Sequence, residues 1–177
     1  ISLIVTAQCT AGSIAAENNK TYTNGAVVCV ANTFNGSITL NNGAVLIINT
    51  TGSFKGTVNA KSGSEIQVQA GGTFQPKNAN NFAAKLINRG TAILGSGTGV
   101  ATNAEFVNYG YMQFASGINL WGNHLKITNE AYGMMDFAAN IQLPNGSELN
   151  NNGTLYTKNL TISSNTELTN RGKLYVI

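Results

Sequence analysis

Aspartate, glutamate and histidine, which supply most general acids, general bases and metal ligands, are scarce in this chain. Asp136 is the only aspartate and His124 is the only histidine among 177 residues. The other acids are six glutamates that lie far apart in the sequence: Glu17, Glu65, Glu105, Glu130, Glu148 and Glu167. Zinc sites, Asp-rich calcium sites and Ser-His-Asp triads need closer sets of these side chains. We therefore expect a non-enzymatic protein with no metal and no cofactor.

Aromatic side chains are the second group that could recognise a ligand. Trp121 is the only tryptophan and lies three residues before His124, inside the longest unit of a repeat described below. Extra residues in a repeat map to outward loops, so this segment is the first candidate ligand site. Tyr111 and Tyr156 join the candidate site, because alternation places both on an outward face, where aromatic rings suit sugars. The alternative is that Trp121 plugs the core where the coil widens.

A repeat of about 20 residues must position these side chains. One glycine or asparagine marks each unit, with spacings of 20, 20, 20, 18, 20, 23, 20 and 19 residues: Gly12, Asn32, Gly52, Gly72, Gly90, Gly110, Gly133, Gly153 and Gly172. Apolar residues alternate with polar ones on both sides of each marker, as in strands with one buried face. Each marker needs a left-handed or otherwise tight backbone, which glycine and asparagine adopt most easily.

A unit of this length is too short for a strand and a crossover helix, which together need about 30 residues. The pattern predicts one all-β domain over residues 1–177, a parallel β-solenoid of about nine coils. An antiparallel β-sandwich is the alternative fold, because Asn24-Gly25, Asn42-Gly43 and Asn145-Gly146 are typical of hairpin turns.

Equivalent positions of neighbouring coils should lie above one another in a solenoid. The phenylalanines Phe34, Phe54 and Phe74 then form a stack, and Lys85, Glu105, Lys126, Glu148 and Glu167 form an outward charge ladder. The turns form a second ladder, in which stacked asparagine amides pass hydrogen bonds from coil to coil. Its members are Asn88, Asn108, Asn151 and Asn170 with Gly90, Gly110, Gly153 and Gly172.

Cys9 and Cys29 each precede a marker by three residues, so we expect them to be neighbours in adjacent coils. Parallel strands in register separate Cα atoms by about 4.8 Å, a distance that a disulfide accepts. A Cys9–Cys29 disulfide would indicate an oxidising compartment. Two unpaired small side chains are the alternative.

The Asn-x-Gly turns resemble those of right-handed parallel β-helices of bacterial surface proteins. The motifs that carry this resemblance are Leu86–Gly90, Phe106–Gly110, Leu149–Gly153 and Leu168–Gly172. Similar repeats occur in autotransporter passengers, filamentous-haemagglutinin-type adhesins and large Bacteroidota adhesins. The resemblance implies a right-handed coil in a secreted or cell-surface protein that serves adhesion or rigid display. Glycans and host or cell-surface proteins are the partners that it implies.

Two other functions remain open for a chain of this kind. A polysaccharide-binding or polysaccharide-active β-helix is the main alternative, and the stacked Glu148 and Glu167 are the only conceivable acid pair. An ice-binding solenoid is the minor alternative. It is suggested by small hydroxyl residues that recur at the outward position beside the marker, namely Ser13, Thr33, Ser53, Thr73 and Thr91.

Charge and the two ends of the chain limit the partners further. The net charge is only +3, without a basic cluster, so we expect no nucleic-acid binding. Ile1–Val5 is far shorter than the roughly 20 apolar residues of a membrane span, so no transmembrane segment is predicted. We expect Ile1–Val5 to be a first strand, with a signal-peptide remnant as the alternative. The chain ends within a strand at Lys173–Ile177, which predicts a fragment of a longer protein or an end-to-end filament subunit.

Overall fold

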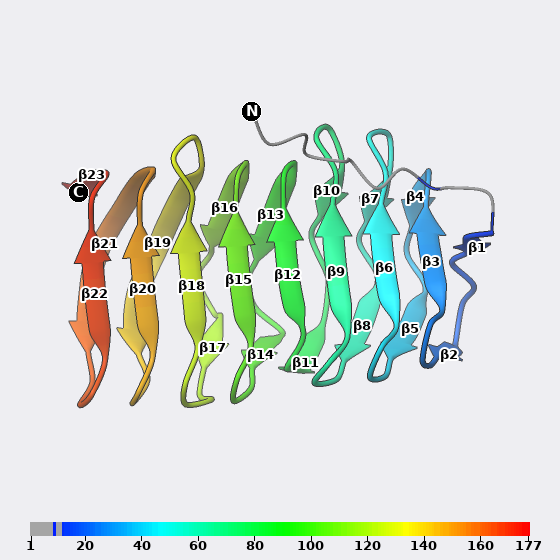
Figure 1. Ribbon diagram of the computed structural model, residues 1–177, viewed down its shortest axis with the longest axis horizontal. Coiled ribbons are helices and arrows are strands. Elements are labelled where there is room, and N and C mark those ends of the chain that lie inside the picture. The colour runs from blue at the N-terminus through cyan, green and yellow to red at the C-terminus, as the bar shows by residue number, and fades with distance from the viewer. Residues whose placement is uncertain (1–8, 10–11) are drawn as a thin grey trace.

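The computed structural model describes residue 9 and residues 12–177, and the described chain is a parallel β-solenoid (Figure 1). Every strand pairing between named strands is parallel, and no helix occurs in the part of the chain that the structure describes. The chain makes about eight turns, one fewer than the nine coils expected, and its period near 20 residues is the one that the repeat predicts. Figure 1 shows it rising in the front sheet, crossing to the back at the top and advancing leftward, which is a right-handed coil. The segment Ile1–Val5, expected to be a first strand, lies outside the described residues.

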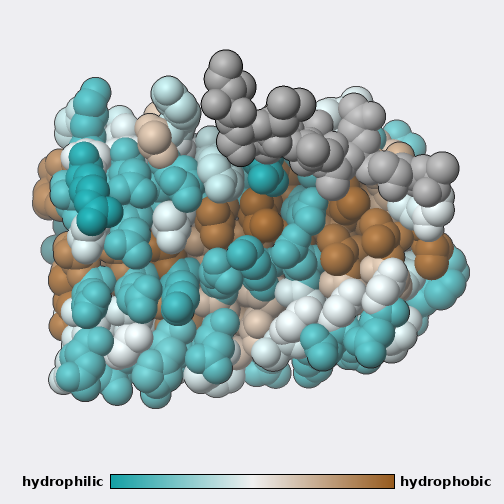
Figure 2. Space-filling model, in the orientation of Figure 1, coloured by the Kyte–Doolittle hydropathy of each residue, from teal (hydrophilic) through white to brown (hydrophobic). Residues whose placement is uncertain are grey.

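A nine-stranded sheet forms the front of the solenoid in Figure 1. Its strands, in spatial order, are β1 (Ile14–Ala15), β3 (Val27–Val30), β6 (Val45–Ile48), β9 (Glu65–Val68), β12 (Lys85–Asn88), β15 (Glu105–Asn108), β18 (Lys126–Asn129), β20 (Glu148–Asn151) and β22 (Glu167–Asn170). Figure 2 views the outer face of this sheet, where hydrophilic and hydrophobic side chains follow separate bands across the strands.

An eight-stranded sheet follows the nine-stranded sheet in each coil. Its strands are β4 (Thr33–Phe34), β7 (Ser53–Phe54), β10 (Thr73–Phe74), β13 (Thr91–Leu94), β16 (Tyr111–Phe114), β19 (Met134–Leu143), β21 (Thr154–Ile162) and β23 (Lys173–Val176). Two three-stranded sheets close the coils, formed by β2 (Lys20–Tyr22), β5 (Ser37–Leu40) and β8 (Thr57–Ala60), and by β11 (Ala79–Phe82), β14 (Thr98–Val100) and β17 (Asn119–Leu120).

Apolar side chains from all sheets fill the inside of the coil, as strand alternation requires. The expected phenylalanine stack is present, with ring centroids 5.4 Å apart for Phe34 and Phe54 and 5.6 Å apart for Phe54 and Phe74. The outward charge ladder is also present in register, and Lys85 and Glu105 form an ion pair of 3.0 Å. The ladder begins one coil earlier than expected, because Glu65 lies beside Lys85.

The Asn-Gly dipeptides that suggested hairpins are corner turns of the solenoid instead. These corners precede the strands of the nine-stranded sheet and hold one residue with positive φ, which glycine and asparagine tolerate best. The residues are Gly12, Gly25, Gly43, Gly63, Asn103, His124, Gly146 and Asn165. A left-handed residue is therefore common at this corner, although the corner before β12 (Lys85–Asn88) has none, and it is not the mark of an antiparallel hairpin.

The predicted Cys9–Cys29 disulfide is confirmed, with 5.7 Å between the Cα atoms. The register that led to this prediction is wrong, because the strand partner of Cys29 is Ala15. Gly12 is therefore not equivalent to the later markers, and Ile14 pairs with Val28 in the nine-stranded sheet instead of preceding Phe34 in the eight-stranded one. The disulfide ties the first described residue to the outer face of β3.

The repeat markers also misalign the units at the 18-residue spacing. Marker spacing places Leu86 in the same position as Val68, but the structure pairs Leu86 with Ile66 and Asn88 with Val68. The reason is a change in turn length between the two long sheets. The turn after Val68 contains four residues, whereas the turn after Asn88 contains only Arg89 and Gly90.

Candidate ligand-binding face

A buried asparagine ladder supports the C-terminal half of the solenoid. Each side-chain Nδ2 donates to the Oδ1 of the next asparagine at 2.7–2.9 Å, along Asn88, Asn108, Asn129, Asn151 and Asn170. The same amides donate to turn carbonyls; Asn108, for example, bonds to the carbonyl oxygens of Gly110 and Met134. The Asn-x-Gly motif did not predict Asn129 as a member of the ladder, because three residues, and not one, lie between it and Gly133. The first four asparagines are buried, so they satisfy the backbone of the turns and are not accessible to a ligand, whereas Asn170 in the last coil is exposed.

The marker glycines Gly90, Gly110, Gly153 and Gly172 have a steric role rather than a conformational one. None of the four has a positive φ. An added Cβ at each would overlap the carbonyl oxygen of a neighbouring marker glycine in the preceding coil. They are required because consecutive turns approach too closely for any side chain.

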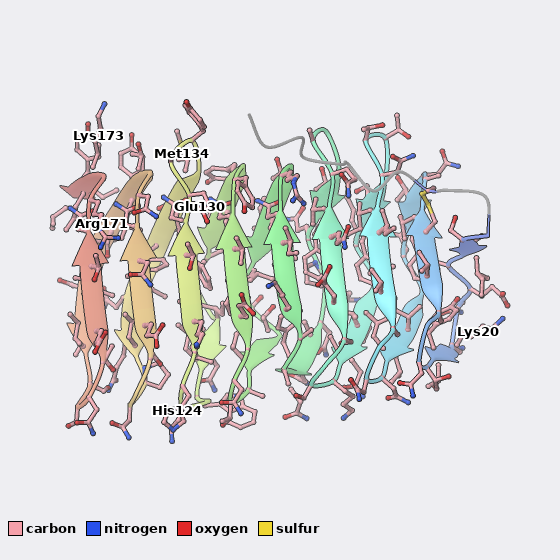
Figure 3. The ribbon with its side chains drawn as sticks, viewed as in Figure 1. Lys20, His124, Glu130, Met134, Arg171 and Lys173 are labelled. Carbon is pink, nitrogen blue, oxygen red and sulfur yellow. A yellow bond between two sulfur atoms is a disulfide. The ribbon has the colours of Figure 1, made fainter. Side chains whose placement is uncertain are left out.

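His124 occupies the left-handed corner position, with φ 57°, where most other coils have glycine or asparagine. Its backbone N–H donates to the carbonyl of Asn145 at 3.1 Å, and its imidazole lies against Gly146. Figure 3 shows His124 at the lower corner, pointing away from the body of the solenoid. A single exposed imidazole with these neighbours can bind a ligand only as a peripheral contact.

Trp121 follows β17 on the same corner and does not plug the core, because its side chain is 52% exposed. The indole lies against Gly99 of the preceding coil, where an added Cβ would meet Nε1 at 3.0 Å. The longest unit has three extra residues, and only one lies between Leu120 and Lys126. The other two lie in the turn from Asn129 to Met134, which the sequence prediction missed.

The two tyrosines of the predicted site lie on another face, the outer face of the eight-stranded sheet. Tyr111 begins β16 and pairs with Met134, which Figure 3 places at the upper corner, opposite His124. Tyr156 lies in the neighbouring row of the same face. The structure therefore separates Tyr111 and Tyr156 from Trp121 and His124.

Tyr111 and Tyr156 belong to a continuous polar and aromatic surface, which we call the tyrosine face. It comprises Tyr111, Gln113, Asp136, Tyr156 and Tyr175. Asp136 accepts hydrogen bonds from Gln113 Nε2 at 2.8 Å and from the Tyr111 hydroxyl at 3.5 Å. The rings of Tyr156 and Tyr175 stack with centroids 5.0 Å apart and an interplanar angle of 16°. Gln113 lies two residues after Tyr111 on the same strand. Strand alternation could therefore have placed it on the same outward face as Tyr111.

The environment of Tyr111 changes its acidity. Partial burial raises its pKa above the ordinary value near 10, and the negative charge of Asp136 and their hydrogen bond raise the pKa further. Tyr111 is therefore a neutral hydrogen-bond donor at physiological pH. Asp136, Gln113 and the tyrosines together offer one carboxylate, one amide, hydroxyls and flat rings, a set that suits hydrogen bonding to and stacking on a polar ring ligand.

The rest of the same face carries hydroxyl groups. Thr33, Ser53, Thr73 and Thr91 lie in register beside Tyr111, as the ice-binding hypothesis requires. Tyr111 and then Met134 interrupt the row. Ser13 lies before β1 in the first coil and is not part of it.

Acid pairs and metal sites need groups of ligands that lie close together. Among the described residues, no three histidine, cysteine, aspartate or glutamate side chains form a group that could hold a metal ion. Glu148 and Glu167 are direct strand partners on the nine-stranded sheet, away from the tyrosine face. Within residues 12–177, no helix is long and apolar enough to cross a membrane.

Comparisons with known proteins return no match to the chain, whether with protein-family models, curated proteins or solved structures.

Proposed function

We propose that this chain is a non-enzymatic β-helix module of a bacterial secreted or cell-surface protein, which serves adhesion by presenting the tyrosine face to glycans. The stacked pair Tyr156–Tyr175 beside Asp136 carries this proposal. Stacked rings offer a flat apolar platform, and the carboxylate accepts hydrogen bonds from hydroxyls at the platform's edge. The resemblance of the Asn-x-Gly turns to bacterial surface β-helices supports the location.

Rigidity of the solenoid supports a display role. The tyrosine face lies on three consecutive strands, β19, β21 and β23, together with β16, and buried asparagines fix the turns before them. A ligand that binds this face meets side chains already held in place, so less conformational entropy is lost on binding.

Binding of the purified chain to immobilised polysaccharides tests the proposal. Tyr156→Ala and Asp136→Ala should each weaken binding by about tenfold, equivalent to ~1.4 kcal/mol. Tyr132→Ala is the matched control, because Tyr132 is 97% exposed on the turn between β18 and β19 and contacts none of the platform. Equal binding by all variants, or no glycan binding by the wild type, would reject the tyrosine face and favour a rigid spacer.

Ice binding is a second candidate function, supported only by the register of the hydroxyl row. Thermal hysteresis that disappears on Thr73→Tyr, but persists in Tyr156→Ala, would assign it. A polysaccharide-active enzyme has less support, because Asp136 is the only carboxylate in the tyrosine face. Release of reducing or unsaturated ends by the purified chain would establish that activity.

A further inference from the structure

A groove continues the tyrosine face toward the N-terminal half of the solenoid. Its volume is about 480 Å³, and it crosses the end of four consecutive coils of the eight-stranded sheet. The groove is lined by Lys55, Gln75, Pro76, Lys77, Ile93, Gly95, Ser96, Ala115 and Ser116.

Small side chains create this depression. Lys77, Gly95 and Ala115 occupy successive coils beyond the strands, and Gly95 and Ala115 leave open space beside the long Lys77 side chain. An added Cβ at Gly95 would meet the Ala115 Cβ at an ordinary 3.5 Å, so sterics do not require glycine there. Absence of a side chain at Gly95 therefore shapes the groove rather than the fold.

The groove is positively charged. Lys55 and Lys77 are exposed, and the ion pairs found among the described residues involve Lys20 and Lys85 only. Asp136, the carboxylate of the tyrosine face, lies three strands beyond Gln75, about 14 Å at 4.8 Å per strand. That separation exceeds the Debye length at physiological salt, so Asp136 does not neutralise the two lysines.

Groove and tyrosine face form one straight track. Lys55 and Gln75 directly follow the paired residues Phe54 and Phe74, and the row continues through Ile93 and Gln113 to Asp136, Tyr156 and Tyr175. From Gln75 to Tyr175 it crosses five strand spacings, about 24 Å. A ligand that uses both ends must be an extended polymer.

We propose that Lys55 and Lys77 bind an anionic group of the ligand, a carboxylate or a sulfate, and that the ligand is an acidic polysaccharide. This inference rests on the proposed glycan-binding function. The two ammonium groups supply point charges for the anion, and Gln75 between them donates or accepts a further hydrogen bond. Stacking on Tyr156 and Tyr175 holds the chain at the other end, so the lysines determine preference for acidic polymers.

Affinities of the intact chain for polygalacturonate, its carboxyl-reduced neutral form, dextran sulfate and dextran test this assignment. The double variant Lys55→Gln/Lys77→Gln should bind the acidic polymers about tenfold more weakly, with a smaller salt dependence, and the neutral polymers unchanged. Lys61→Gln/Lys158→Gln is the control, because it removes the same charge from exposed sites outside the groove. A comparison of the affinities for polygalacturonate and for dextran sulfate shows whether the anion is a carboxylate or a sulfate.

Failure of this inference differs from failure of the proposed function. If Tyr156→Ala weakens all binding but the lysine variants match the wild type, the groove assignment is wrong and the tyrosine face stands. If the control lysines matter equally, the preference is a net-charge effect and the groove is rejected. Lysine-dependent binding of duplex DNA with no polysaccharide binding would overturn both.

Discussion

The two halves of this solenoid stabilise the same corner, the turn between the two long sheets, with different residues. The inward residue that precedes the turn between the two long sheets is Val30, Ile48 and Val68 in the N-terminal half. In the C-terminal half the same register position holds an asparagine, namely Asn88, Asn108, Asn129, Asn151 and Asn170. Parallel pairing runs through the change without a break, because Val68 and Asn88 are direct partners.

Backbone hydrogen bonding in the turns explains why one half needs asparagine and the other does not. In the N-terminal half, the four-residue turns after Ile48 and Val68 close on themselves, as when Gly52 N–H donates to the Asn49 carbonyl at 2.8 Å. The two-residue turn after Val30 has its Ala31 carbonyl bonded by the Thr51 hydroxyl at 2.8 Å. The two-residue turns of the C-terminal half receive their bonds from buried asparagine amides instead. The turn from Glu130 to Gly133 uses both devices, with a closing bond of 2.8 Å and Asn129 beneath it. The comparison indicates that backbone satisfaction, not solenoid pitch, selects the residue at this corner.

Gly110→Ala should have the largest effect of the substitutions considered, because both halves depend on close turn stacking. Its Cβ would overlap the Gly90 carbonyl oxygen and lie 2.8 Å from the Arg89 carbonyl atoms, all of them backbone. We expect unfolding free energy to fall by about 3 kcal/mol, measured by urea denaturation.

Gly95→Ala is the control for that experiment, since its Cβ has a normal contact distance and its φ is not positive. It should change stability by less than about 0.5 kcal/mol. Equal loss in the two variants would mean that glycine flexibility, and not turn stacking, explains the marker.

Asn108→Val converts one C-terminal corner into the N-terminal type while keeping its short turn. The carbonyls of Gly110 and Met134 and the Oδ1 of Asn129 would each lose a donor. We expect a loss of about 2 kcal/mol in urea denaturation. A neutral result would show that the turn carbonyls find other donors and that the ladder is dispensable.

The reverse change tests the boundary between the halves. Asn88 Oδ1 is buried without a partner, because Val68 beside it has no donor. Val68→Asn can extend the ladder by one coil and satisfy this oxygen, whereas Ile48→Asn places an amide among apolar neighbours. Val68→Asn should therefore be about 1 kcal/mol less destabilising than Ile48→Asn. The opposite order would show that the long turns exclude asparagine at this corner.

Sequence periodicity predicted the solenoid because the inward and outward positions alternate in nearly every strand. It misaligned the coils at Leu86, since a glycine marker does not distinguish a two-residue turn from a four-residue one. Cys9 was matched to Cys29 through the same assumption, and the disulfide forms although Ala15 is the strand partner.

The candidate site was harder to predict than the fold. Trp121 and His124 stand out by composition, yet the structure uses His124 for a left-handed corner and leaves both away from the tyrosine face. Asp136 and Tyr175 join Tyr156 only through the pairing of three coils, which no local motif encodes. Strand register, which depends on turn length, was the information that the sequence did not supply directly.

Titration of Tyr111 is the smallest expected effect, and it asks whether the tyrosine face of the C-terminal half is as preorganised as its corners. Burial first, and then Asp136, raises the pKa of Tyr111 above its ordinary value near 10. Because the folded state favours the protonated phenol, this stabilisation is complete below pH 10 and is lost as pH rises through the raised pKa. The difference between the ultraviolet titration curves of the wild type and of Tyr111→Phe should show Tyr111 ionising above pH 10. Asp136→Asn should lower that pKa only partly, since burial remains; an unchanged pKa would show that Asp136 does not contact Tyr111 in solution.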